Sequence, residues 1–429
     1  MRAQSQALVA RSAASLEIGS RPRSLIDGIS RRSLFELFGR IESGALSVVE
    51  NGQRHVFGRP SDLSATITVH DAAAYRALLW RGSVGAGEGY MAGLWTCDDL
   101  AALARIFARN LDALAAIEGG AARLMRFTSQ LVAKATRRNT RAGSRRNIAH
   151  HYDLSNEFFG IFLDESMMYS SGIFEWEAAT LEDAQLAKLD RVCQKLDLRP
   201  QDHLLEIGSG WGALAIHAAR SYGCRVTTTT VSAEQHRLTT ERVRALGLQD
   251  RIEVLLSDYR DLTGQYDKLV SIEMVEAVGH EYLEDYFRAC SERLAPDGQM
   301  LIQAITIADQ HHDQHRASVD FIQEYIFPGS CIPSVTSMMN ATTRGTDLRL
   351  FHFEDITPHY AQTLRIWRER FLENADAVRR LGFDEPFLRM WEYYLAYCEG
   401  GFAERYLGCV QMLFTKPDSR RTSLLPKLR

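Results

Sequence analysis

The alternation of strand and helix patterns between residues 180 and 306 limits the fold of this chain more than any other feature. Strands are predicted at 203–208, 225–230, 252–257, 268–274 and 300–306, and helices at 211–221, 233–245 and 282–294. Strands that are joined through helices pair in parallel by right-handed crossovers, and the helices cover both faces of the sheet. The predicted fold class is therefore α/β, a doubly wound and mostly parallel Rossmann-like sheet whose ligands bind beyond the carboxyl ends of the strands.

A second, smaller α+β domain is predicted before this sheet, because 429 residues exceed the usual size of a single core. Its strand-like runs lie at 46–49 and 65–69, and its helical patterns lie at 72–80 and 100–117. Between residues 134 and 146 there are six basic residues and no acidic ones, and Gly143 and Ser144 interrupt any helix. The predicted division is an N-terminal accessory domain at 1–125, a basic linker at 126–146 and a catalytic domain at 147–429.

The composition favours a cytoplasmic protein and gives no reason to expect nucleic acid. The seven cysteines are widely spaced and form no CxxC pair or Cys/His cluster, so we expect reduced thiols and predict no metal site. No apolar run approaches the ~20 residues of a membrane-spanning helix, and the N-terminus lacks the apolar core of a secretory signal. The net charge of −4 argues against a nucleic-acid partner.

Three glycines, Gly208, Gly210 and Gly212, lie where the strand at 203–208 turns into a helix, with Ser209 between the first two. Glycine lets the backbone of such a turn approach a ligand closely. Nicotinamide- and flavin-binding folds use related turns, but their GxGxxG spacing and the acidic end of their second strand are missing here. Glu206 stands just before the turn, where methyltransferases commonly carry an acidic residue. The turn therefore predicts S-adenosylmethionine as the cofactor.

Polar residues at the ends of the next two strands complete the predicted cofactor site. Asp258 directly follows the third strand and can accept a hydrogen bond from an adenine amino group. Thr230 and Gln235 can hold the ribose hydroxyls. The alternative is that these side chains only cap strands and helices. Taken together with the glycine turn, they favour a methyltransferase.

Further motifs occur in a fixed order along most of the chain. They are GSVGAGEGYMAGLW at 82–95, HYDLSNEFF at 151–159, MMYSSGIFEW at 167–176, TVSAEQ at 230–235, LSDYRDL at 256–262, EMVEAVGHE at 273–281 and EYIFPGSCIPS at 324–334. Over roughly residues 65–416 the chain resembles the cyclopropane-fatty-acyl-phospholipid synthases and the related mycolic acid methyltransferases. At 273–281 and at Gln303 it is most similar to the plant-like branch of the cyclopropane synthases.

The resemblance implies methyl transfer from S-adenosylmethionine to the cis double bond of a phospholipid acyl chain. An alkene that accepts a methyl group becomes a carbocation, and loss of a proton from the new methyl closes a cyclopropane ring. This chemistry needs a dry pocket with electron-rich walls and a base that does not trap the cation. In the family that base is a bound bicarbonate.

Carried over by the resemblance, the bicarbonate ligands are Glu276, Tyr360, the backbone of Ile305, and the residues at positions 171 and 303. The best-known bacterial pattern has cysteine where Ser171 stands and histidine where Gln303 stands. Serine and glutamine can still donate hydrogen bonds to an anion. The alternative for Glu276 is a surface carboxylate that caps the following helix, and the catalytic interpretation is preferred. Without the resemblance, Tyr360 is equally well interpreted as a core residue.

The resemblance also assigns cofactor contacts to Tyr169 and Ser170, and an aromatic contact with adenine to Tyr259. Cys398 aligns with a family cysteine that is sometimes treated as catalytic. The reaction has no need for a thiol, and a lone cysteine in an apolar stretch is more often a small core residue.

The implied substrate is an unsaturated acyl chain at a membrane surface, so we expect a cytoplasmic enzyme that is peripheral to the membrane. The basic linker and the basic segment at 419–429 could contact anionic lipid. A related product, a methylene- or methyl-branched chain, remains the main alternative because the same cation can lose another proton or be reduced by a partner. A small-molecule methyltransferase would not need the lipid-type N-terminal domain, and a non-enzymatic lipid-binding protein would be expected to lose the cofactor glycines or Glu276. The sequence leaves a homodimer open.

Overall fold

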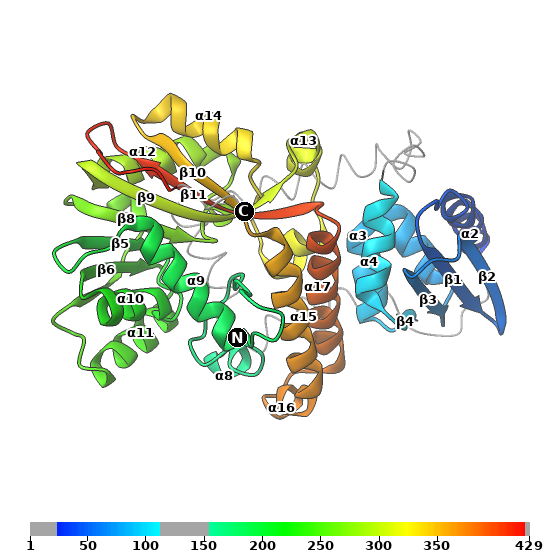
Figure 1. Ribbon diagram of the computed structural model, residues 1–429. Helices are drawn as coiled ribbons and strands as arrows, with labels where there is room; N and C mark the ends of the chain where they lie inside the picture. The colour runs from blue at the N-terminus through cyan, green and yellow to red at the C-terminus, as the bar shows by residue number, and fades with distance from the viewer. Residues whose placement is uncertain (1–23, 112–153, 425–429) are drawn as a thin grey trace. The chain divides into compact units, whose positions relative to one another are not determined.

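The computed structural model describes residues 24–111 and 154–424 (Figure 1). Their contacts divide them into two compact units. The first unit comprises residues 24–111, 317–326 and 364–406, and the second comprises 154–316, 327–363 and 407–424. Residues 364–406 thus group with the N-terminal segment, whereas the sequence-based division assigned them to the catalytic domain. The predicted linker at 126–146 lies outside the described residues.

The first unit contains a four-stranded sheet of order β2-β1-β3-β4. Its strands are β1 (Ala45–Glu50), β2 (Gln53–Gly58), β3 (Ser64–Val69) and β4 (Trp95–Cys97), and its helices include α2 (Leu25–Phe38), α3 (Ala73–Met91) and α4 (Leu100–Arg109). β1 pairs antiparallel with β2 and parallel with β3. The two strand runs expected in this region are therefore present, while β2 was not predicted.

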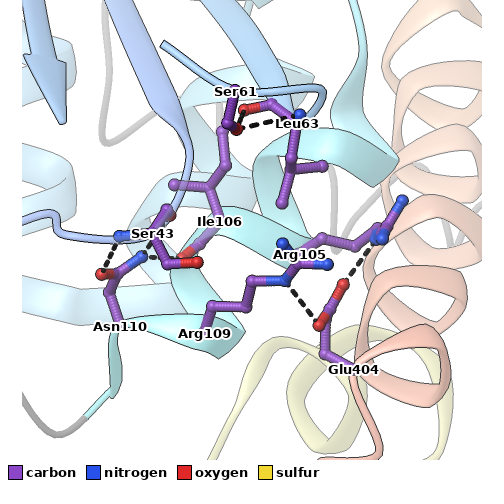
Figure 2. A network of polar contacts seen from close by, with 8 residues as sticks. All are labelled: Ser43, Ser61, Leu63, Arg105, Ile106, Arg109, Asn110 and Glu404. Atoms are coloured by element: carbon purple, nitrogen blue, oxygen red, sulfur yellow. Dashed lines mark hydrogen bonds and ion pairs between the residues drawn. The ribbon is translucent and has the colours of Figure 1, made fainter. Parts of the chain in front are cut away.

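Helix α17 (Glu385–Ala403) belongs to the first unit because it packs against α3 and α4. Glu404, the residue after α17, accepts hydrogen bonds from the Nε atoms of Arg105 and Arg109 on α4, both at 2.7 Å (Figure 2). Asn110, at the end of α4, accepts from the backbone N–H of Ser43 and donates to its carbonyl oxygen. The contacts of Glu404 join segments that are about three hundred residues apart in the sequence.

The second unit is built on a seven-stranded sheet of order β10-β11-β9-β8-β5-β6-β7. Its strands are β5 (His203–Ile207), β6 (Arg225–Thr230), β7 (Ile252–Leu256), β8 (Tyr266–Ile272), β9 (Leu294–Ile307), β10 (Arg349–Asp355) and β11 (Leu407–Thr415). The five strands from β5 to β9 pair in parallel, and only β11 runs antiparallel to its neighbours β9 and β10. The predicted α/β, mostly parallel fold class is confirmed.

Helices cover both faces of this sheet (Figure 1). One face packs against α9 (Leu181–Leu196), α10 (Ala213–His217) and α11 (Ala233–Ala245), and the other packs against α12 (Leu283–Arg293) and α14 (Val335–Gly345). Successive side chains in a strand point to opposite faces, so Leu269 of β8 joins one core while its neighbour Val270 joins the other. Both residues are fully buried.

The remaining helices of the second unit include α8 (Asn156–Phe159) and α13 (Asp309–Ala317). After β10, α15 (Thr357–Glu373) begins in the second unit and ends in the first, and α16 (Ala375–Arg380) belongs to the first. None of the helices within residues 24–111 and 154–424 combines the length and the apolar character needed to cross a bilayer.

Candidate active site

The glycine turn after β5 has the backbone that the sequence predicts. Gly208, Gly210 and Gly212 all have positive φ angles, of 96°, 50° and 88°, a region that other residues rarely adopt. A Cβ atom on Gly212 would lie 2.7 Å from Cγ2 of Thr239, so this position has no room for a side chain. The backbone N–H groups of Gly208 and Ser209 donate to the carbonyl oxygen of Thr229, which fastens the turn to β6.

A pocket opens beside this turn at the carboxyl ends of β5, β6 and β7. All the predicted cofactor residues except Gly212 line it, namely Tyr169, Ser170, Glu206, Gly208, Ser209, Gly210, Thr230, Gln235, Asp258 and Tyr259. Gly212 shapes the turn instead, as the residue before α10. The position of the pocket is the one that a doubly wound sheet offers to its ligands.

Several polar side chains of the pocket have partners that the sequence did not indicate. Both carboxylate oxygens of Asp258 accept from the guanidinium of Arg260, at 2.8 and 2.7 Å. The hydroxyl of Thr230 donates to Oε1 of Gln235 at 2.8 Å, so the two residues predicted to hold the ribose are linked to each other. These bonds fix the side chains in place before any ligand binds.

Two buried ionisable groups belong to the pocket or its surroundings: Glu206 lines it, and Lys188 contacts Ser170, which lines it. Burial raises the pKa of Glu206 to about 8, and its carboxylate accepts a 2.6 Å hydrogen bond from the hydroxyl of Thr228. Burial lowers the pKa of Lys188 to about 8, and its Nζ donates to the hydroxyl oxygen of Ser170 at 2.7 Å. Glu206 is therefore mostly neutral at pH 7, while Lys188 is mostly charged.

A second buried cluster adjoins the pocket and is centred on Glu273, which lines the pocket itself. Oε1 of Glu273 accepts from the backbone N–H of Ser171 at 3.0 Å and from Nε2 of Gln303 at 2.9 Å. Oε2 accepts from the hydroxyl of Tyr360 at 2.6 Å, and Sγ of Cys409 lies 3.6 Å from Oε1. We call Glu273, Ser171, Gln303, Tyr360 and Cys409 the Glu273 cluster.

Glu276 lies one turn further along the chain, in the 3-10 turn Val275–Ala277. Its side chain is buried, which contradicts the alternative of a surface carboxylate. Oε1 accepts from the backbone N–H of Ile305, and Oε2 has no hydrogen-bond partner among the described residues. Burial, followed by the charge of Glu273, raises the pKa of Glu276 to about 8.

The five residues expected to bind bicarbonate thus lie close together, next to Glu273, a residue that the sequence analysis did not identify. Three of them donate to Glu273, and the backbone of Ile305 donates to Glu276. Ser171 takes part only through its backbone, because its hydroxyl donates to the carbonyl oxygen of Gly172. The available signal for Glu273 was an acidic residue at the carboxyl end of a strand, three positions before Glu276.

Gln303 is held by a chain of hydrogen bonds that leads away from the cluster. Its Oε1 accepts from Nε2 of Gln411 at 2.9 Å, and Oε1 of Gln411 accepts from Nζ of Lys195 at 2.7 Å. Gln303 and Gln411 face each other in the register of β9 and β11. Lys195 also forms an ion pair with Glu354.

Cys398, which the resemblance proposed as catalytic, lies on α17 in the first unit and is not among the residues that line the pocket. Burial raises the pKa of its thiol well above the usual range, which disfavours the reactive thiolate. Its catalytic role stays a prediction.

No set of three or more His, Cys, Asp or Glu side chains in the described part of the chain could hold a metal ion.

Comparison with known proteins places the site in a family. The model of the family "Mycolic acid cyclopropane synthetase" matches residues 139–412. The chain is 42% identical to the tuberculostearic acid methyltransferase UfaA1 of Mycobacterium tuberculosis, over 77% of this chain and 78% of that protein. It is 36% identical to the cyclopropane-fatty-acyl-phospholipid synthase of Escherichia coli, over 82% of this chain and 88% of that protein.

A solved structure of a cyclopropane synthase is also similar to this chain. The mycolic acid cyclopropane synthase CmaA1, which was solved in complex with SAH and CTAB, is 30% identical and superposes with a TM-score of 0.60. The match covers 63% of this chain and 98% of that one. With its glycine turn, its pocket and these similarities, the chain belongs to the mycolic acid cyclopropane synthetase family of S-adenosylmethionine-dependent methyltransferases.

Proposed function

We propose that this protein transfers a methyl group from S-adenosylmethionine to the cis double bond of an unsaturated phospholipid acyl chain, with closure of a cyclopropane ring. The observation that supports this most is the shared pocket, since Glu273 and the predicted cofactor residues line the same space. A methyl donor and a carboxylate that can take up a proton would then face one acceptor. Methylation at nitrogen or oxygen would not need a buried pair of carboxylates at this position.

Different residues of the pocket would serve the cofactor and the carbocation. Bound S-adenosylmethionine supplies the methyl group, and Glu206, Tyr259 and the glycine turn would hold it. Tyr169 lies on the pocket wall and packs against Phe159 and Phe327, with ring centroids 5.3 and 6.4 Å apart. Aromatic faces stabilise a nearby cation without donating electrons to a bond, which suits a carbocation intermediate.

The test is turnover with labelled S-adenosylmethionine on vesicles. We expect label in the lipid fraction when the vesicles contain a phospholipid with cis-unsaturated chains, and none when its saturated counterpart replaces it. NMR of the product should show the shielded protons of a cyclopropane ring. Absence of transfer to every unsaturated lipid, while the protein still binds cofactor, would exclude the lipid reaction.

A methylene-branched chain is the second candidate, and it is favoured by the similarity to a protein named tuberculostearic acid methyltransferase. In this reaction a hydride shifts to the cationic carbon from the neighbouring carbon that bears the new methyl. Loss of a proton from that methyl then leaves a methylene branch, C=CH₂. A methyl branch would further require a reductant from a partner protein. Vinylic protons in place of ring protons in the same NMR spectrum would select this product.

We also propose that the reaction takes place on the membrane surface, because the acyl chains lie in a bilayer. The basic residues between 134 and 146 lie outside the described ranges but supply positive charge for anionic lipid. We expect cosedimentation with anionic vesicles that weakens as salt is raised. Equal binding to neutral vesicles at all salt concentrations would contradict a role for this charge.

A further inference from the structure

The donors that the family resemblance assigns to bicarbonate are already engaged in this protein. Ser171, Gln303 and Tyr360 donate to the carboxylate of Glu273, and the backbone of Ile305 donates to Glu276. A bicarbonate ion on these donors would have to displace the Glu273 carboxylate and then lie against it in a buried site, next to Glu276. Burying charges of the same sign together is costly. The residues present therefore do not fit bicarbonate.

We propose that the carboxylate of Glu273 itself accepts the proton that leaves the new methyl group, so that this enzyme carries its base within the chain. The inference rests on the proposed alkene methylation. Glu273, which the family resemblance did not single out, is then the catalytic base.

The backbone at Glu273 supports this assignment. β8 ends at Ile272, and Glu273 follows with a φ of 49°, in the left-handed region that a residue with a side chain seldom occupies. Strain of this kind persists when the surrounding structure holds it, and it is concentrated at functional sites. Glu273 lines the same pocket as the predicted cofactor residues.

The hydrogen-bond chain behind the cluster sets the direction of the amide that holds Glu273. An ammonium group can only donate, so Lys195 requires the oxygen of the Gln411 amide. The NH₂ group of Gln411 is then left for the oxygen of Gln303, and the NH₂ group of Gln303 is left for Glu273. Lys195 and Gln411 are positioning residues, and together they present a donor to the base.

The two neighbouring glutamates differ in the way a base and its neutral companion should. Burial raises the pKa of Glu273, and three hydrogen bonds from nitrogen and oxygen donors partly offset this by favouring its ionised form. Glu276 has one such donor, and burial together with the charge of Glu273 raises its pKa to about 8. Glu273 is therefore the member of the pair whose ionised form is held by more donors, and its charge disfavours ionisation of Glu276.

The deprotonation step transfers one proton from the new methyl group to Glu273. A C–H bond of the transferred methyl breaks, its electron pair forms the last bond of the ring, and the proton goes to a carboxylate oxygen of Glu273. The proton passes to water when the product leaves. Because contacts from four residues hold the carboxylate at the wall, it is hindered from moving onto the cation and forming an ester.

The experiment compares the wild type with Glu273→Gln and Glu273→Ala in buffer freed of carbon dioxide, with and without added bicarbonate. We expect wild-type turnover to be independent of bicarbonate, and Glu273→Gln to lose about 100-fold or more in kcat while the Kd for cofactor stays unchanged. Glu273→Ala leaves the three donors around an anion-sized space, so bicarbonate or formate should restore part of its turnover. Glu284→Gln is the matched control and should keep full activity, because Glu284 is a partly exposed residue of α12 that pairs with Arg288 and does not line the pocket.

A second readout does not depend on turnover. Binding of ¹³C-labelled bicarbonate, followed by NMR line broadening, should be absent from the wild type and present in Glu273→Ala. The proposal is overturned if the wild type binds bicarbonate or loses turnover when it is removed, or if Glu273→Gln remains nearly as active as the wild type. Failure of the proposed function looks different, because then no variant methylates lipid in any buffer while the binding result still decides which anion occupies the cluster.

Discussion

The two ends of the pocket are built from different parts of the chain. At the cofactor end, consecutive residues of one turn shape the wall with their backbone, and Gly208 and Ser209 are fastened to β6 by main-chain hydrogen bonds. At the proton-accepting end, side chains from separate segments converge on Glu273, including Gln303 of β9 and Tyr360 of α15. The first end depends on local conformation, and the second depends on the identity and direction of each side chain.

This difference implies that the two ends fail in different ways. An added side-chain atom should damage the cofactor end, because its glycines have no strain-free substitute. Loss of a single donor should damage the proton-accepting end without affecting cofactor binding. The following predictions test this separation.

The largest effect is expected for Gly212→Val. The substitution places a β-branched residue at a φ of 88° with its Cβ 2.7 Å from Thr239, so we expect loss of cofactor binding and destabilisation by roughly 3 kcal/mol. Calorimetric titration with S-adenosylhomocysteine and thermal unfolding measure the two effects. Gly247→Ala is the matched control, because Gly247 also has a positive φ but nothing lies within 4 Å of an added Cβ. Cofactor binding by Gly212→Val at wild-type affinity would refute the backbone account.

Gln411→Glu should lower kcat by about tenfold, with little change in the KM for cofactor. A carboxylate at this position still accepts from Lys195, so stability should be retained. It cannot donate to Gln303, whose amide would then turn its NH₂ group toward the new carboxylate and its oxygen toward Glu273. The split between kcat and KM is the measurement. Unchanged turnover in a folded Gln411→Glu protein would mean that the direction of the Gln303 amide does not matter.

Cofactor affinity should rise a few-fold between pH 6 and pH 8, through Glu206. Its pKa of about 8 keeps the carboxyl group neutral in the free protein, and the positive charge of a bound cofactor lowers that pKa. Binding therefore releases a proton, so that affinity increases with pH until the free carboxyl ionises. Titration in buffers of different ionisation enthalpy measures the proton release. Glu206→Gln should abolish it, and proton release that persists in this variant would assign the effect to another group.

The smallest effect is expected for Ser171→Ala, which should keep turnover within about twofold of the wild type. The hydroxyl that is removed donates only to the neighbouring carbonyl of Gly172, and the N–H group that contacts Glu273 remains. Initial rates on unsaturated vesicles are sufficient to test this. A loss of tenfold or more would show that the side chain at position 171 takes part in the reaction.

The sequence predicted the cofactor end well because its information is local. The helix expected at 233–245 and the strand expected at 225–230 coincide with α11 and β6, and the glycine turn lies between β5 and α10 as expected. The strand follows from its run of β-branched residues, RVTTTT, and the turn follows from the spacing of its glycines. The residues that line the pocket are attached to the ends of those elements, so they could be named from the same pattern.

The proton-accepting end could not be predicted in the same way. The sequence places Glu273 inside the predicted strand at 268–274. Strand alternation does not reveal that the strand ends at Ile272 and that the next residue has a positive φ. Its donors Ser171 and Tyr360 are 102 and 87 residues away in the sequence. The antiparallel strand β11 and the grouping of residues 364–406 with the first unit were missed for the same reason, since both depend on long-range pairing.

The contact of Ser171 through its backbone has a consequence for how enzymes of this type can diverge. Because an N–H group is present in almost every residue type, position 171 can change freely while a carboxylate remains in the cluster. Replacement of Glu273 by a small residue would leave the same donors around a space that dissolved bicarbonate could fill. A single mutation would then replace the Glu273 base with bicarbonate from solution. Enzymes with either base could therefore descend from one another without passing through an inactive ancestor.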